Sequence, residues 1–112
     1  MSNVEKYIKD GMVAVAISPG YGAGWSTWND NELAETLLFH PDIINMILSD
    51  KQSEIDHDWL VEHFGSKYED VYCGGAKNLY IKWIPVGTQF RIDEYDGSER
   101  VIELANDNIY IA

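Results

Sequence analysis

The chain has 112 residues, a length that fits one domain, and 46% of them are hydrophobic, including four Trp, seven Tyr and three Phe. This composition excludes an intrinsically disordered chain. Nineteen acidic residues oppose eight basic ones, which gives a formal net charge of −11. Such a surface repels nucleic acid and anionic membranes; we expect it either to attract a basic groove on another protein or to serve solubility alone.

Cysteine usage and hydropathy indicate the compartment. Cys73 is the only cysteine, so the chain can form no intramolecular disulfide and no cysteine-rich metal cluster. The apolar pair before Cys73 and the Gly-Gly pair after it predict a buried thiol at a strand end. We find no run of apolar residues typical of a signal peptide or a membrane span. The sequence therefore predicts a cytoplasmic protein.

The first predicted element is a strand over Met12–Ile17, an unbroken apolar run that we expect to be buried on both faces. Residues 20–29, here called the Gly/Trp loop, are too rich in glycine for a regular element. Apolar residues at helical spacing then predict a helix over 32–39 and another over 42–50, after Pro41. A third helix is expected to have Ser53 as its N-cap and to end at Gly65.

The last third of the chain alternates with period two, which is typical of strands. Strands are predicted over 79–84, 89–95 and 99–104, with a possible closing strand over 109–111. We therefore expect one α+β domain over residues 1–112: an antiparallel β-meander of three to five strands packed against two or three helices. The apolar C-terminus could close the sheet within one chain or pair with a second copy in a homo-oligomer.

The Gly/Trp loop is the first candidate binding site. Glycine N–H groups between a strand and a helix can cradle phosphate, but the glycine spacing matches neither a dinucleotide fingerprint nor a P-loop. The two indoles could instead stack on a nucleobase, or they could simply plug the core. The candidate ligand-binding residues are Gly20, Tyr21, Gly22, Gly24, Trp25, Trp28 and Asn29.

Carboxylates around the second predicted turn form another candidate site. Neighbouring acids on a strand point apart, and Ile92 occupies the first ligand position of a calcium-loop pattern, so a solvated turn is the favoured interpretation. Its charge could still meet a basic partner. The candidate partner-binding residues are Asp93, Glu94, Asp96 and Glu99.

Catalytic motifs are absent from the sequence. His40, His57 and His63 lack the spacing of zinc ligands, and no nucleophile elbow or Ser-His-Asp order is visible. We expect no catalytic residue, no metal and no cofactor.

Residues 18–29, 72–75 and 90–99 together give a pattern that resembles a group of small bacteriophage and prophage accessory proteins. The resemblance implies action in the bacterial host cytoplasm and an anti-defence role in evading host immunity. Three hypotheses follow. The chain could be a non-enzymatic protein that sequesters a nucleotide-like small molecule through the Gly/Trp loop. It could be an acidic inhibitor that imitates nucleic acid and occupies a host protein, or a small hydrolase that uses the turn carboxylates.

Overall fold

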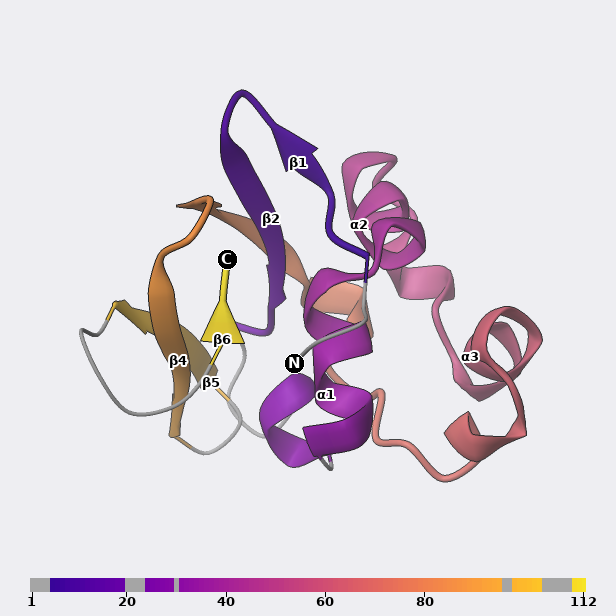
Figure 1. The fold of residues 1–112 in the computed structure, drawn as a ribbon. Helices are drawn as coiled ribbons and strands as arrows, with labels where there is room; N and C mark the ends of the chain where they lie inside the picture. The colour runs from indigo at the N-terminus through magenta and orange to yellow at the C-terminus, as the bar shows by residue number, and fades with distance from the viewer. Residues whose placement is uncertain (1–4, 20–23, 30, 96–97, 104–109) are drawn as a thin grey trace.

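The computed structural model describes residues 5–19, 24–29, 31–95, 98–103 and 110–112. They form an α+β fold, as predicted, in which two antiparallel sheets lie beside three helices (Figure 1). The strands are β1 (Ile8–Lys9), β2 (Met12–Ile17), β3 (Tyr80–Pro85), β4 (Gln89–Tyr95), β5 (Ser98–Glu103) and β6 (Tyr110–Ile111). The helices are α1 (Asn31–Phe39), α2 (Pro41–Leu48) and α3 (His57–Phe64). Short 3₁₀ helices span Ser26–Trp28, Gln52–Glu54, Ser66–Tyr68 and Ala76–Asn78.

Strand β2 is buried on both faces, as its unbroken apolar run predicts. Val13, Val15 and Ile17 project into one apolar cluster, which also contains Ile84 of β3 and Phe90 of β4. The alternate residues of β2 are alanines, and they belong to a second cluster that the helices cover. Because alanine side chains are small, α1 and α2 can pack closely on this face of the strand.

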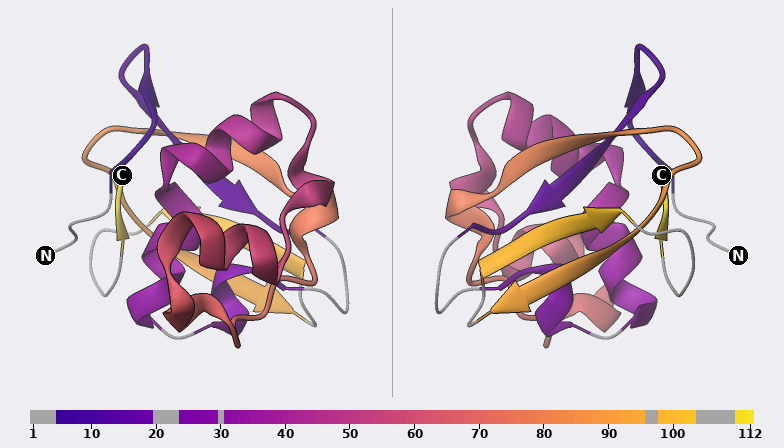
Figure 2. Two further views of the ribbon diagram at one scale, coloured as in Figure 1. Left: turned by 90° about the vertical axis from the view of Figure 1, so that its right-hand side faces the viewer. Right: turned by 90° about the vertical axis from the view of Figure 1, so that its left-hand side faces the viewer.

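The strands divide between two sheets, of order β1-β2-β3 and β5-β4-β6. Strands β3 and β4, which the sequence joins through residues 85–88, therefore do not pair as neighbours of one meander. The turn between them bonds elsewhere: Val86 N–H donates to the carbonyl of Gly11, and Gly87 N–H donates to that of Ala112. Gly87 also has a φ of +89°, a conformation that favours glycine. The chain thus passes from one sheet to the other at this turn, as Figure 2 shows.

The helix ends follow local chemistry. Pro41 opens α2, and the ring Nδ1 of His40 accepts a hydrogen bond of 3.1 Å from Asp42 N–H. The N-cap predicted for the third helix is wrong: Asp56, not Ser53, caps α3, and its carboxylate accepts from Trp59 N–H at 2.9 Å. Asp56 is the better acceptor because a carboxylate also interacts favourably with the positive end of the helix dipole. Gly65 ends α3, as predicted, with a φ of +106°.

Within the described ranges, the structure has no helix with both the length and the apolar character that crossing a membrane needs.

Candidate functional site

The described part of the Gly/Trp loop is fixed to strand β5 by a single carboxylate. Glu99 accepts hydrogen bonds from the backbone N–H groups of Ser18 at 3.0 Å, Trp25 at 2.9 Å and Thr27 at 3.1 Å. The hydroxyl of Thr27 donates to the same carboxylate at 2.5 Å. Backbone amides that converge on a carboxylate in this way form an anion-binding nest. Here the anion belongs to the protein itself, so these amides are not available for a phosphate.

Trp25 belongs to the core and cannot be a stacking platform. Its side chain has 0% of its surface exposed, and its indole N–H donates to the carbonyl of Leu37 at 2.8 Å. This corrects its assignment as a ligand-binding residue, because an indole enclosed by the helix cluster has no free face. Trp25 therefore fills space in the core, which is the alternative that the sequence left open.

Asn29 connects the Gly/Trp loop to a segment far along the chain. Its amide nitrogen Nδ2 donates to the carbonyls of Trp25 and Tyr72, both at 2.8 Å, and its Oδ1 accepts from Tyr72 N–H at 2.8 Å. Both amide hydrogens are therefore already bonded, and the side chain has little capacity left for a ligand. We assign Asn29 a structural role.

Of the two described tryptophans of the loop, Trp28 is the exposed one, with 38% of its surface accessible. Its ring lies so close to Gly24 that a Cβ atom there would stand 2.7 Å from the indole. The Tyr72 ring is tilted against it with 4.7 Å between centroids, and the indole N–H donates to Glu94 Oε2 at 3.2 Å. We call the surface formed by Thr27, Trp28, Tyr72 and Glu94 the Trp28 face.

The predicted acidic cluster is divided by the structure. Asp93 and Glu94 reach the surface, but Asp93 forms an ion pair of 2.9 Å with Arg100 on the neighbouring strand. Glu99 is only 3% exposed, which corrects its assignment to partner binding, since its charge is enclosed by the amides of the loop. Among the described members of the cluster, Glu94 is the acid that the structure brings to the Trp28 face. Asp96 lies outside the described residues, as do Gly20, Tyr21 and Gly22 of the loop.

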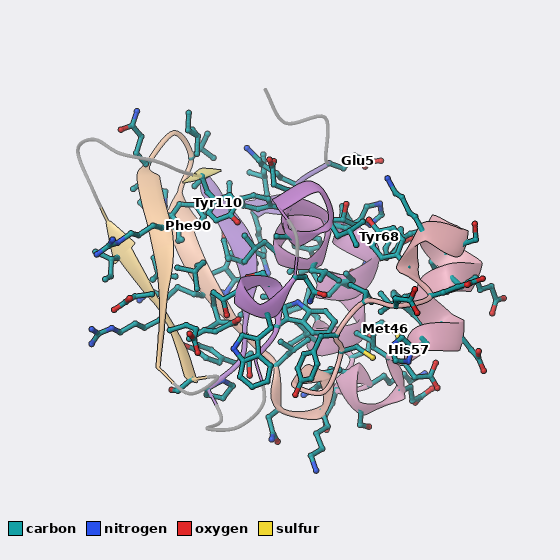
Figure 3. The ribbon with its side chains drawn as sticks, turned by 90° about the horizontal axis from the view of Figure 1, so that it is seen from below. Glu5, Met46, His57, Tyr68, Phe90 and Tyr110 are labelled. Carbon is teal, nitrogen blue, oxygen red and sulfur yellow. The ribbon has the colours of Figure 1, made fainter. Side chains whose placement is uncertain are left out.

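A hollow of about 350 Å³ lies beside the Trp28 face. Its walls are three loop residues (Ser26, Thr27 and Asn29), residues 92–94 of β4, and Tyr110 of β6. Tyr110 and Phe90 lie on the side of the sheets, whereas Tyr68 and His57 lie on the side of α3 (Figure 3). The hollow therefore combines the two predicted sites, the Gly/Trp loop and the acids of β4, in one place.

Among the residues that the structure describes, three ionisable groups have shifted pKa values. Burial raises the pKa of Tyr110, and the negative charges of Glu35 and Glu99 raise it further. The hydrogen bond from Arg100 lowers the pKa of Asp93. Burial, followed by the charge of Asp56, raises the pKa of the Cys73 thiol, which disfavours the reactive thiolate.

Cys73 is half-buried and lies in the loop between the third and fourth 3₁₀ helices, not at the strand end that the sequence predicts. Among the residues that the structure describes, no three His, Cys, Asp or Glu side chains are grouped so that they could hold a metal ion.

Sequence reasoning missed three residues of this region. Tyr72 supports Trp28, Tyr110 lines the hollow, and the hydroxyl of Ser26 is buried there without a partner. The motif at residues 72–75 was a partial signal for Tyr72, because Gly74 lies under its ring as Gly24 lies under Trp28. No pattern in the sequence singles out the other two.

Comparisons with known proteins give no family for this chain. A scan of protein-family models finds no match, and searches of curated proteins and of solved structures find none. The site is therefore interpreted from its own geometry.

Proposed function

We propose that this chain is a non-enzymatic binding protein that holds a basic partner protein against its Trp28 face. The observation that supports the proposal most directly is the fixed, half-exposed indole of Trp28, bonded to a surface carboxylate of Glu94. Tryptophan is enriched at the centres of protein interfaces, because a large rigid ring loses little conformational entropy on binding. A carboxylate beside the ring favours a partner of positive charge.

The charge of the whole chain supports the same class of partner. A net charge of −11 produces a negative potential that accelerates association with a basic protein and repels nucleic acid and nucleotides. In the context that the resemblance to phage accessory proteins implies, the partner is a protein of the bacterial host. Occupying it would be an anti-defence function.

Sequestration of a nucleotide-like molecule is a second proposal, supported only by the exposed ring of Trp28. Trp25 is buried and the loop amides already bond to Glu99, so neither can bind such a ligand. The carboxylate of Glu94 would also repel a phosphate group placed beside Trp28. Titration with a nucleoside monophosphate distinguishes the two proposals. A base stacked on Trp28 should shift the nuclear magnetic resonance signals of its indole, and the affinity should depend little on salt concentration.

The test of the first proposal is site-specific photo-crosslinking in bacterial cells. A crosslinking amino acid replaces Arg100, which is exposed and pairs with Asp93 next to Glu94, in one variant, so that Trp28 itself is kept; it replaces Glu62, which is exposed on α3, in the matched control. We expect a basic host protein to be crosslinked from position 100 and not from position 62. Its association with the purified unmodified protein should slow steeply as ionic strength rises, and Glu94→Gln should slow it more than Glu62→Gln. Equal crosslinking from both positions, or equal effects of the two neutralised acids, would contradict the proposal.

A further inference from the structure

Another hollow, of about 370 Å³, lies on the side of α3, away from the Trp28 face (Figure 3). Its walls come from the junction of α1 and α2, the end of α3 and the 3₁₀ helix Ser66–Tyr68. The rings of His40, His63 and Phe64 belong to these walls. Neighbouring rings hold them in place: Phe64 packs on His40 with 4.7 Å between centroids, and His63 stacks on Trp59 at 3.9 Å. Fixed aromatic walls of this kind suit a planar ligand.

Tyr68 brings a buried hydroxyl to this hollow. The residue is 2% exposed, and its hydroxyl forms no hydrogen bond with the residues that the structure describes. Among those residues, the fully enclosed side-chain polar atoms without a partner are Ser26 Oγ and Gln52 Oε1. The Tyr68 hydroxyl is therefore not enclosed, and a ligand can reach it. Because a buried tyrosine hydroxyl usually has a hydrogen-bond partner, an unbonded one in the wall of a hollow indicates a polar ligand atom beside it.

The two imidazoles of the hollow have complementary hydrogen-bonding patterns. His40 Nδ1 accepts from Asp42 N–H, so this ring is neutral and carries its proton on Nε2. His63 Nδ1 lies 2.8 Å from the carbonyl of Trp59, which can only accept, so this ring carries a proton on Nδ1. In its neutral form, His63 therefore leaves Nε2 as an acceptor. The pair offers a ligand one N–H donor and one nitrogen acceptor.

The charges around the hollow favour an uncharged ligand. Lys67 and Glu5 both line it, and their opposite charges balance. The bonding of His40 adds no charge, because a protonated ring could not accept from Asp42 N–H. The net charge of −11 on the whole chain repels phosphate and other anions. The hollow thus offers hydrogen-bonding groups and aromatic walls without a net charge.

We propose that this hollow binds an uncharged nucleobase, as the free base or the nucleoside, whose edge carries neighbouring N–H and C=O groups. A uracil ring has this complement: one N–H group for His63 Nε2, and two carbonyl groups for His40 Nε2–H and the Tyr68 hydroxyl. Phe64 supplies an aromatic wall for the base. A volume of about 370 Å³ lies within the range of small-molecule sites, roughly 300–1,000 Å³. This site is separate from the Trp28 face and goes beyond the proposed function.

Titration with uridine tests the proposal through the histidine ring signals in nuclear magnetic resonance spectra. The chain has three histidines, and His57 is an internal control because its ring bonds to the Val71 carbonyl outside this hollow. The variants His40→Gln and His63→Gln assign the other two signals. We expect uridine to shift the His40 and His63 signals and to leave the His57 signal and the Trp28 indole signal unchanged.

Two matched ligands test the chemistry of the site. In 3-methyluridine a methyl group replaces the hydrogen of the ring N–H, and its affinity should be about tenfold lower because His63 Nε2 loses its donor. Uridine monophosphate adds negative charge to the same base, and it should bind more weakly than uridine to a chain of net charge −11.

The variant Tyr68→Phe removes a hydroxyl that makes no hydrogen bond in the described fold. Its thermal stability should equal that of the unmodified protein, whereas its affinity for uridine should fall about fivefold, the loss of one neutral hydrogen bond. The control Tyr80→Phe removes a hydroxyl from an exposed tyrosine of β3 outside the hollow and should bind uridine as the unmodified protein does.

Four results would overturn the proposal: no shift of the His40 and His63 signals with uridine, equal affinity for 3-methyluridine, tighter binding of uridine monophosphate, or unchanged affinity in Tyr68→Phe. A shift confined to the Trp28 indole would reject this hollow and support stacking of the base on the Trp28 face. None of these results bears on the basic partner, whose binding is tested separately by crosslinking beside the Trp28 face.

Discussion

Glu99 and Trp25 lie 74 positions apart in the chain, yet Glu99 Oε2 accepts a 2.9 Å hydrogen bond from the backbone N–H of Trp25. The backbone N–H of Glu99 also donates to the carbonyl of Ser18 at 2.7 Å. One residue of β5 therefore connects Ser18, which follows β2, and the described part of the Gly/Trp loop to the second sheet. This connection determines where the neighbouring Trp28 is held.

The first prediction concerns this carboxylate. Glu99→Ala removes the acceptor of three backbone N–H groups, two of them buried and one partly buried, and we expect the free energy of unfolding to fall by about 3 kcal/mol. Glu99→Gln should lose less, because one amide oxygen can still accept. Urea denaturation measures both. Glu62→Gln, an exposed acid of α3, is the control and should change stability by less than about 0.5 kcal/mol. Equal stability of Glu99→Ala and the control would show that this carboxylate does not fix the loop.

The two tryptophans of the loop should respond differently to truncation. Trp25→Ala leaves a cavity in the core and frees the carbonyl of Leu37, so we expect a loss of about 3–5 kcal/mol. Trp28→Ala removes a ring that is already partly in water and should cost about 1 kcal/mol. Urea denaturation again measures both losses, and partner binding should be abolished in Trp28→Ala. A larger loss of stability at Trp28 than at Trp25 would contradict the assignment of core and surface.

The contrast between Trp25 and Glu99 shows how far the sequence predicts this site. The Gly/Trp loop could be recognised from its composition, but a sequence does not tell which of two nearby indoles faces the core. Glu99 looked like a solvated acid because it follows a turn. It is buried because a loop from the other end of the chain supplies the amides that stabilise its charge. Contacts of such long range have no local signal.

The fold was predicted more completely than the site, since periodicity is a local property. The apolar run of β2 and the helical spacing of α1, α2 and α3 determine these elements by themselves. Alternation with period two predicts a strand but not its partner. This is why the division into two sheets at residues 85–88 could not be read from the pattern, and why β3 pairs with the distant β2.

Gly24 offers a way to move Trp28 without removing it. A Cβ atom at position 24 would stand 2.7 Å from the Trp28 ring, so Gly24→Ala should displace the indole from Tyr72 and from Glu94. We expect a clear change in the Trp28 indole signal and weaker binding of the basic partner, with Trp25 undisturbed. Gly65→Ala is a control for a glycine whose Cβ would meet nothing within 4 Å, although its φ of +106° makes that change costly to stability. An unchanged Trp28 signal in Gly24→Ala would contradict the close packing of ring on glycine.

The last prediction concerns the pH dependence of Cys73. Burial and the charge of Asp56 raise the pKa of this thiol above its ordinary value of 9.0, so the folded protein holds the proton at a pH where the unfolded chain releases it. The stability associated with this group is therefore complete below pH 9.0 and is lost as the pH rises through the folded-state pKa. We expect alkylation by iodoacetamide at neutral pH to be slower in the folded protein than in the urea-unfolded chain.

Asp56→Asn separates the two causes, because asparagine can still cap α3 while it removes the charge. The pH at which the alkylation rate reaches half its maximum should fall in this variant and remain above 9.0, since burial is the larger cause. Asp58→Asn, an exposed acid of α3 that has no part in the shift, is the control and should leave that pH unchanged. A midpoint below 9.0 in the unmodified protein would instead identify Cys73 as an activated thiol and indicate a nucleophilic function for the loop at residues 72–75.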